Sequence, residues 1–448
     1  MTTPSLAQSL PPLDGEIAWD LEARQAAAGD FGKLVSGLPR AVLRPGSTDD
    51  IAAMLRWAAE QRWRVAARGT GHSLYGRSLA PDGLVIDMRC LDAVRGIEAD
   101  RIWVGGGAAW RSVLAASLPH GLAPPVLTNY LDMSVGGTLS AGGIGGTSHR
   151  FGAQTDNVVE LEVVTGDGRV LRCSPTDNAE LFDTVRAGLG HVGIITGAVL
   201  RLVPAPTQVR SYMVRYPDLA ALAAGQRQAL ARAHHLQGSI LPDPSGGWTY
   251  QMGAAVFATD AEPEPVPPID VGSEATVETE DMAYADFVTL FDGFVEALRQ
   301  DGQWNHPHPW LLTFLPDSTA EQVATSVLDR IGPADLGPYG RLVFYPIDTG
   351  PFATELLRIP AEPVMFVLNL FRFLPPDHDL VGAAVTENRS LYRQVRRHGG
   401  LLYPVSAFPM RPADWKAHFG SAWDKLLDAV DHFDRHHLLA PGQGAVQP

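Results

Sequence analysis

The chain has 448 residues, 45% of them hydrophobic, which is enough for two domains of ordinary size with full cores. Acidic residues outnumber basic residues by 50 to 35, so nucleic acid and anionic membrane surfaces, which need a basic footprint, are disfavoured as partners. The two cysteines, Cys90 and Cys173, cannot form a disulfide framework and the histidines lack zinc-ligand spacing, so we expect a cytoplasmic protein without a metal site.

The first part of the chain is predicted to contain short strands and helices separated by glycine turns. No signal peptide is predicted, because residues 1–16 have no basic start and no apolar core. Residues 48–60 predict a helix with Thr48 as its N-cap, since acidic residues follow it and apolar residues recur at helical spacing. Strands are predicted at 62–67, 83–88, 101–107 and 194–206, a further helix at 109–121, and a hairpin at 158–172 around the turn Gly166-Asp167-Gly168.

Beyond residue 206 the pattern changes to longer helices and strands. Residues 218–236 predict a helix and 248–257 a strand, whereas 259–281, rich in proline and acidic residues, predict a mobile surface loop. The chain ends in a predicted helix, 412–433, followed by an irregular tail. These patterns indicate two α+β domains, the first of which ends near residue 205.

Two clusters of glycines stand among these elements. Residues 68–78 place Gly69, Gly71 and Gly76 around His72, and residues 134–152 contain seven glycines. Glycine permits positive φ angles and close approach of the backbone to a ligand, and successive N–H groups form a nest that suits a pyrophosphate. Tight turns without a ligand are the alternative for either cluster alone.

Neither cluster has the Rossmann fingerprint. The second reads GGIGG, which is not the GxGxxG that joins a strand to a helix, and the first runs from strand to strand. A nicotinamide-type fold is therefore a poor fit, although two glycine loops still indicate a dinucleotide. A lone histidine in a turn is usually structural, but the glycines around His72 expose it beside the predicted phosphate site, which leaves a chemical role open.

Residues 68–88 and 129–158 resemble the FAD-binding domain of cytokinin dehydrogenases, within the vanillyl-alcohol-oxidase or PCMH-type flavoprotein superfamily. The likeness continues in 177–206, in WNHPHPWL and in FDRHHLLAPGQG, so it covers most of the chain from about residue 40 onward. The resemblance implies an α+β, two-domain PCMH-type FAD-binding fold. Its parts would be an FAD domain at 1–205, a substrate domain with an antiparallel sheet and helices at 206–411, and a segment, 412–448, that returns to the FAD domain.

In this family the histidine of the GHS motif is bonded to the 8α-methyl carbon of the flavin, which implies covalent FAD on His72. A second, cysteinyl link is not expected, because the loop 124–133 contains no cysteine. Arg77 stands where the family usually has glutamine, and it either adds a cation near the flavin or points to solvent. The other FAD-binding positions that the resemblance implies are Gly69, Gly71, Ser73, Ser134, Gly136, Gly137, Ser140, Gly142, Ile144, Ile194, Tyr403 and Gln443.

The chain departs from the family at two carboxylates. The family's catalytic acid lies in a W-T-D-Y-L segment, and this chain reads LTNYL, with Asn129 at that position. A second carboxylate, at the mouth of the substrate channel, corresponds to Gln237. An amide keeps one acceptor oxygen and adds a donor, but it cannot act as a base near neutral pH. Asn129 is therefore expected to orient a substrate N–H or O–H group without taking its proton.

Other candidates come from the segment HPHPW. It supplies His306 as a possible catalytic base and Trp310 as an apolar wall for the substrate, whereas His308 is expected to be structural.

Together these features predict an FAD-dependent oxidoreductase that transfers a hydride from a substrate C–H bond, next to an amine or hydroxyl, to flavin N5. Oxygen or another acceptor would reoxidise the flavin. Two alternatives stay open. The loss of both carboxylates favours oxidation or oxidative cyclisation of a specialised metabolite over cytokinin cleavage, and a flavoprotein that binds a ligand without turnover is the other alternative.

Overall fold

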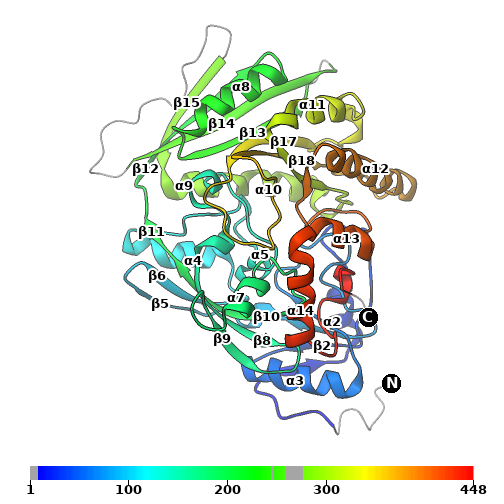
Figure 1. Cartoon of the computed structure of the whole chain (residues 1–448). Helices are drawn as coiled ribbons and strands as arrows, with labels where there is room; N and C mark the ends of the chain where they lie inside the picture. Colours follow the sequence, from blue (N-terminus) through cyan, green and yellow to red (C-terminus); the bar gives the residue numbers. More distant parts are fainter. Residues whose placement is uncertain (1–8, 244–245, 259–275, 447–448) are drawn as a thin grey trace.

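The computed structural model of the chain describes residues 9–243, 246–258 and 276–446. Its strands form a four-stranded, a five-stranded and an eight-stranded sheet, with a two-stranded pair of β7 (Leu122–Ala123) and β11 (Val203–Pro204). The eight-stranded sheet and its helices occupy one half of the molecule, and the two smaller sheets lie together in the other half (Figure 1). Helices and strands mix in both halves, which confirms the predicted two-domain α+β fold.

The four-stranded sheet carries the first glycine-rich loop. Its strands β2, β4 and β3 are parallel, and β1 joins β2 antiparallel. Parallel neighbours need a crossover connection. The helix α3 (Thr48–Gln61) lies between β2 and β3, and residues 69–83 connect β3 to β4. In spatial order the strands are β1 (Glu16–Ala18), β2 (Ala41–Arg44), β4 (Leu84–Asp87) and β3 (Val65–Arg68).

The N-cap of α3 is Ser47, whose Oγ accepts a hydrogen bond from the N–H of Asp50 at 3.3 Å. Thr48 is the first residue of the helix, so the predicted cap is wrong by one position. The aspartates of the first turn still favour this end of the helix, because negative charge there complements the helix dipole.

The five-stranded sheet is antiparallel and carries the second glycine cluster. Within that cluster lie two short helices, α5 (Val135–Leu139) and α6 (Ser148–Phe151). The predicted hairpin is confirmed, since β8 and β9 pair across a turn in which Gly168 has a φ of +76°. In spatial order the strands are β5 (Val94–Glu98), β6 (Arg101–Gly105), β10 (Gly193–Arg201), β8 (Val158–Thr165) and β9 (Val170–Cys173), and α4 (Trp110–Ser117) and α7 (Ala179–Val185) pack beside them.

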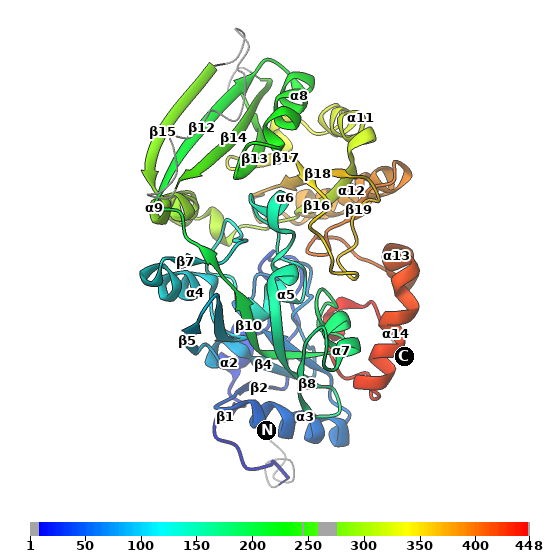
Figure 2. The ribbon, with the colours of Figure 1, turned by 60° about the vertical axis from the view of Figure 1, so that its left-hand side comes forward.

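The eight-stranded sheet presents two different faces. Leu342 and Phe344 belong to a core that helices α8 (Leu219–Leu230), α11 (Asp317–Leu328) and α12 (His378–Arg397) cover (Figure 2). The opposite face turns toward the smaller sheets, where α9 (Tyr284–Thr289) and α10 (Phe291–Gln300) lie. In spatial order the strands are β15 (Thr276–Ala283), β12 (Gln208–Tyr216), β14 (Trp248–Ala258), β13 (His235–Pro242), β17 (Arg341–Asp348), β18 (Val364–Phe371), β16 (Leu311–Pro316) and β19 (Leu401–Leu402).

Two predicted elements in this half need correction. The helix predicted at 218–236 ends at Leu230, because residues from His235 onward pair with β14 and β17 as strand β13. The segment predicted as a loop at 259–281 is a strand from Thr276 onward, and β12 is its partner. Residues 259–275 of that prediction lie outside the described residues.

The C-terminal segment returns to the two smaller sheets. One predicted helix is two, α13 (Pro412–Phe419) and α14 (Trp423–Phe433), because Gly420 adopts a φ of +55° between them. Both helices contribute to the core of the five-stranded sheet. The tail then runs beside β3, where the N–H of Val65 donates to the carbonyl of Leu438 at 2.8 Å. The division into an FAD domain at 1–205, a substrate domain at 206–411 and a returning segment at 412–448 stays a prediction.

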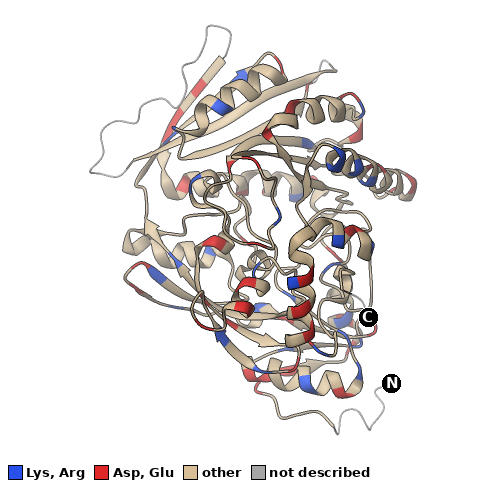
Figure 3. Cartoon of the chain, viewed as in Figure 1, with Lys and Arg blue, Asp and Glu red and all other residues tan. Residues whose placement is uncertain are grey.

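Charged residues of both signs are spread over both halves of the molecule in the view of Figure 3. Within the described ranges, no helix combines the length and the apolar character needed to cross a membrane. Cys90 is exposed and Cys173 is buried, and both are free thiols.

Candidate active site

A cavity of about 510 Å³ lies between the two glycine-rich segments and the eight-stranded sheet. This volume is within the range of small-molecule sites. Alternate residues of a strand share one face, and on the sheet side Gln237 and Ser239 of β13 line the cavity together with Arg341, Val343 and Tyr345 of β17. The predicted site residues that line the cavity are Gly69, Gly71, His72, Ser73, Arg77, Asn129, Ser134, Gly136, Gly137, Ser140, Ile144, Ile194, Gln237, Trp310, Tyr403 and Gln443.

The loop after β3 offers free backbone donors to this cavity. The N–H groups of residues 70–74 donate to no acceptor among the described residues. Gly71 has a φ of +76°, which side chains rarely adopt. A Cβ on Gly69 would lie 1.9 Å from Ser134 Oγ, so only glycine lets the loop approach the start of α5. Successive free N–H groups suit an anion such as a pyrophosphate.

The second glycine cluster is bonded mainly to the protein itself. The N–H of Gly136 donates to the Gly106 carbonyl at 2.8 Å, and the N–H of Gly143 donates to Tyr403 Oη at 3.0 Å. Burial raises the pKa of Tyr403 to about 12, so the hydroxyl stays protonated and keeps its own proton to donate. The first loop therefore offers an anion more free donors than this cluster does, and binding of a pyrophosphate by these glycine clusters stays a prediction.

Gly142 lies outside the lining of the cavity. Its N–H donates to the Thr138 carbonyl at 2.8 Å, and a Cβ built on it would meet Leu357 at 2.9 Å. The structure therefore does not place Gly142 at the cofactor, although its positive φ of +125° still requires glycine.

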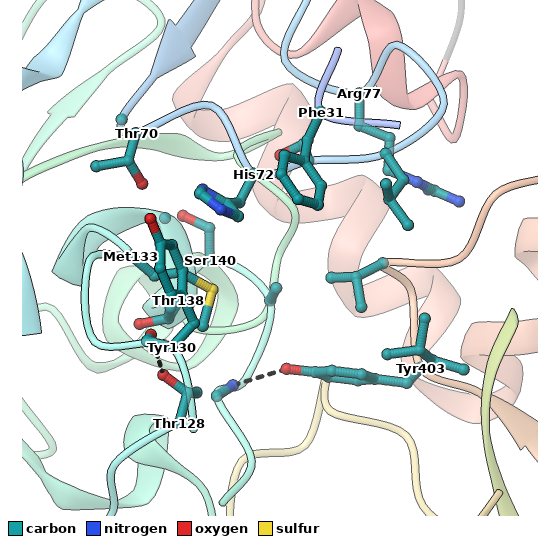
Figure 4. A pocket seen from close by; sticks show the side chains of 18 of the residues that line it. Phe31, Thr70, His72, Arg77, Thr128, Tyr130, Met133, Thr138, Ser140 and Tyr403 are labelled. Carbon is teal, nitrogen blue, oxygen red and sulfur yellow. Dashed lines mark hydrogen bonds between the residues drawn. The ribbon is translucent and has the colours of Figure 1, made fainter. Parts of the chain in front are cut away.

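His72 lies inside a group of aromatic rings. Phe31 stacks on its imidazole with ring centroids 4.4 Å apart, and the ring of Tyr130 lies 4.7 Å away (Figure 4). Both imidazole nitrogens are buried, and neither makes a hydrogen bond of good geometry in the described part of the chain; a backbone contact with Thr70 only partly offsets the effect of burial. Burial lowers the pKa of His72 to about 4, so the ring is neutral at neutral pH and one nitrogen keeps a free lone pair.

Arg77 joins the first loop to the C-terminal part of the chain. Its Nη1 donates to Gln443 Oε1 and its Nη2 to the Ser406 carbonyl, both at 3.1 Å, and its guanidinium lies 5.1 Å from the centre of the Trp415 ring. The side chain is buried and lines the cavity, so of the two predicted orientations it has the one away from solvent. Burial lowers the pKa of Arg77 to about 10, which leaves it charged at neutral pH.

Asn129 and Gln237 form a reciprocal amide pair. Asn129 Nδ2 donates to Gln237 Oε1 at 3.1 Å, and Gln237 Nε2 donates to Asn129 Oδ1 at 2.7 Å. Two ionised carboxylates in this position would repel each other, whereas two amides match donor to acceptor. Each amide keeps one N–H and one oxygen lone pair for a substrate, and neither can take up a proton near neutral pH.

Of the candidates in the segment HPHPW, Trp310 lines the cavity, whereas His306 and His308 do not. Trp310 lines the cavity and its Nε1 donates to the Arg372 carbonyl at 2.8 Å. His308 is buried and its Nε2 lies 3.3 Å from the Gln303 carbonyl, which suits the expected structural role. His306 does not line the cavity, so the structure does not place this candidate base where it could reach a substrate.

Comparison with known proteins identifies the family. Residues 39–174 match the family described as FAD binding domain, and residues 272–446 match the one described as cytokinin dehydrogenase 1, FAD and cytokinin binding. A relative named uncharacterized oxidoreductase ORF5 in fasciation locus, from Rhodococcoides fascians, is 37% identical, over 93% of this chain and 96% of the relative. Cytokinin dehydrogenase 1 of Oryza sativa subsp. japonica is 32% identical, over 96% of this chain and 91% of the relative. The chain belongs to the cytokinin dehydrogenase-like family of FAD-dependent oxidoreductases.

The cavity of this oxidoreductase fits FAD on its own geometry. The free N–H groups of residues 70–74 suit the pyrophosphate, and the unpartnered nitrogens of His72 face the same cavity. At Gly137 the backbone can approach a ligand closely, since there is no side chain; a Cβ there would lie 2.8 Å from Ser134 Oγ. Further donors for the flavin ring are available from Tyr403 and Arg77.

Four cavity residues of this oxidoreductase escaped the sequence analysis. Phe31 belongs to no motif, and only the tertiary structure places its ring on His72. The tertiary structure also brings the ring of Trp304 to 5.9 Å from that of His72, measured between ring centroids. Tyr130 directly follows Asn129, so its place in the LTNYL motif was a usable signal. Arg341 begins the apolar strand RLVFYPI, and a cation at the head of a buried strand could also have been noticed.

Proposed function

We propose that this FAD-dependent oxidoreductase oxidises a small substrate at a C–H bond next to an amine nitrogen or a hydroxyl. FAD, when bound, supplies a hydride acceptor at N5 and passes the electrons to oxygen or another acceptor. The observation that carries the proposal is that the Asn129–Gln237 pair opens into the same cavity as His72 and the loop 70–74. A neutral hydrogen-bonding site for a substrate thus adjoins the residues that suit the cofactor.

The amide pair defines what the chain itself contributes. An amide oxygen can accept a hydrogen bond from a substrate N–H or O–H, and an amide N–H can donate to a second polar atom. Orientation of this kind brings the reacting atoms together without transferring a proton. Trp310 and the aromatic rings beside it form an apolar wall of the cavity. The proton released from the substrate is therefore expected to leave to solvent and not to a side chain at Asn129.

We also propose that His72 carries the flavin covalently. Support comes from its position in the GTGHS loop, its burial and its two unpartnered nitrogens. A neutral imidazole with a free lone pair can bond to carbon, whereas a protonated imidazole cannot. The low pKa of His72, which results from burial, keeps the ring in the neutral form at neutral pH.

The absence of a carboxylate at Asn129 separates this chain from its cytokinin-oxidising relatives in the proposed chemistry. A general base contributes about 10²–10⁴-fold to a rate. Isopentenyladenine is accordingly expected to reduce the flavin slowly or not at all, and oxidation or oxidative cyclisation of a specialised metabolite becomes the more suitable reaction. We also propose that the protein works in the reducing cytoplasm, because the thiol of Cys90 is exposed and free.

Anaerobic mixing of the holoprotein with a panel of amines and alcohols tests the proposal. At least one class of compound is expected to bleach the oxidised-flavin absorbance rapidly. If some compounds perturb the flavin spectrum but none reduces it, the alternative holds, and the protein is a flavoprotein that binds a ligand without turnover.

A further inference from the structure

Arg341 places a positive charge in the cavity without a protein partner. Its side chain lines the cavity from the first position of β17, and its guanidinium carbon lies 4.0 Å from the centre of the Phe294 ring on α10. Across the described ranges, no residue forms a hydrogen bond or an ion pair with it. Burial lowers the pKa of Arg341 to about 10, so it remains charged at neutral pH.

The surroundings of Arg341 leave its N–H groups unused. Its strand neighbour is Phe371, whose ring lies 4.7 Å from that of Trp310. Aromatic rings can attract a cation through their faces, but they accept no conventional hydrogen bonds. A guanidinium has five N–H donors, and a charge buried without such partners is destabilising. The arrangement therefore favours an anion that enters the cavity from outside the chain.

The charges that line the cavity agree with this. Its described lining contains two arginines, Arg77 and Arg341, and no aspartate, glutamate or lysine. Arg77 already donates to Ser406 and Gln443, whereas Arg341 has no acceptor. The chain as a whole carries a net charge of −15, so the positive cavity does not simply follow from the composition.

The sheet register separates Arg341 from the amide pair. Ser239 lies opposite Val343 in the antiparallel pair of β13 and β17. Gln237 lies two positions before Ser239, and Arg341 lies two positions before Val343. Because the two strands run in opposite directions, Gln237 and Arg341 are four positions apart along the sheet, about 13 Å. One end of a substrate can thus contact the amides while the other end contacts the guanidinium.

We propose that the substrate of this enzyme carries a carboxylate and that Arg341 binds it. This inference rests on the proposed function for the reacting end of the molecule, and it adds the chemical class of the other end. The neutral amides at Asn129 and Gln237 support it, because family carboxylates at these positions would repel an anionic substrate. Arg341 then determines specificity, because two of its N–H groups can donate to the two oxygens of the substrate carboxylate.

The test measures binding of phenylacetate and 3-phenylpropionate, and of their primary amides, to the holoprotein. The readout is the perturbation of the flavin spectrum and the quenching of tryptophan fluorescence, neither of which needs turnover. The acids should bind about tenfold or more tightly than the amides, since a charge-assisted hydrogen bond is stronger than a neutral one. In Arg341→Gln this preference should disappear with amide affinity unchanged, and Arg341→Lys should retain part of it.

A matched control is Arg215→Gln, because Arg215 pairs with Glu278 at 2.6 Å on the outer edge of the same sheet. It should leave the preference intact. Equal affinities of acid and amide for the wild type, or a preference that survives Arg341→Gln, would overturn the inference. If Arg341→Gln fails to fold, as judged by flavin content and melting temperature, a preference undiminished in Arg341→Lys overturns it. Flavin reduction by amines or alcohols without any preference for acids would overturn this inference alone, whereas a preference for acids without flavin reduction would overturn only the redox proposal.

Discussion

Replacing Asn129 with aspartate is expected to give the cavity the proton acceptor that it lacks. The amide of Asn129 gives one hydrogen bond to Gln237 and receives one from it, at 3.1 and 2.7 Å. Aspartate has nearly the same shape and keeps the bond that it receives from Gln237 Nε2. It loses the bond that Asn129 Nδ2 donated, so the result is a carboxylate held by one neutral partner.

The structure sets the size of the two effects. The lost hydrogen bond is neutral and the pair is partly open to the cavity, so the free energy of unfolding should fall by about 0.5–1.5 kcal/mol. The loop that suits the pyrophosphate is untouched, and FAD content should not change. A correctly placed general base contributes about 10²–10⁴-fold. The rate of flavin reduction by isopentenyladenine should therefore rise by about 10²-fold or more in Asn129→Asp.

Anaerobic stopped-flow measurement of flavin reduction gives this rate directly. The control is Asn369→Asp, which makes the same chemical change in the same cavity and preserves the oxygen that accepts the Thr313 N–H at 3.2 Å. A rise in Asn129→Asp alone supports a base at this position. An equal rise in both variants would attribute the effect to negative charge anywhere in the cavity. No rise in Asn129→Asp, with full flavin content, would refute the reasoning.

Three further predictions concern the cofactor loop and the buried histidines. In acid-precipitated wild type the pellet should stay yellow and yield a flavin-bearing peptide that contains His72, whereas His72→Ala should release all colour to the supernatant; a colourless wild-type pellet would disprove the link. Gly69→Ala would place a Cβ 1.9 Å from Ser134 Oγ, and this overpacking, about 1–3 kcal/mol, should lower FAD content. The double variant Gly69→Ala/Ser134→Gly should restore the FAD, and Gly96→Ala, with nothing within 4 Å of its Cβ, should have no effect. Burial lowers the pKa of His191 and of His308 from 6.5 to about 4, so the unfolded chain takes up these protons first as the pH falls. The free energy of unfolding should therefore fall between pH 6.5 and pH 4, by up to about 3 kcal/mol for each histidine. Urea titrations at a series of pH values measure this, and a free energy of unfolding that does not change with pH would contradict the neutral, buried state of these rings.

The sequence by itself determined the individual hairpins, helices and glycine loops of this protein, because these depend on residues that are close together in the chain. The hairpin at 158–172 follows from alternating apolar residues around a glycine turn, and the helix at 48–60 follows from its spacing and acidic first turn. The glycine loops indicated a dinucleotide, because a loop that must approach a ligand closely needs glycine at set places. The resemblance of these motifs to those of cytokinin dehydrogenases then predicted FAD and a role for His72. Local patterns misplaced the end of a helix at Leu230, where pairing in the large sheet ends a helical pattern early, and they predicted a loop where β15 begins at Thr276.

The tertiary structure alone decided which distant side chains meet. Asn129 and Gln237 are 108 residues apart, and Arg77 and Gln443 are 366 residues apart, yet each pair shares a hydrogen bond. Periodicity indicates which face of an element is buried, but it carries no information about which other element covers that face. That choice depends on the packing of whole sheets, whose contacts compensate the entropy lost in closing long loops. For this reason the sequence left Arg77 with two possible orientations, and the C-terminal tail beside β3 selected the buried one.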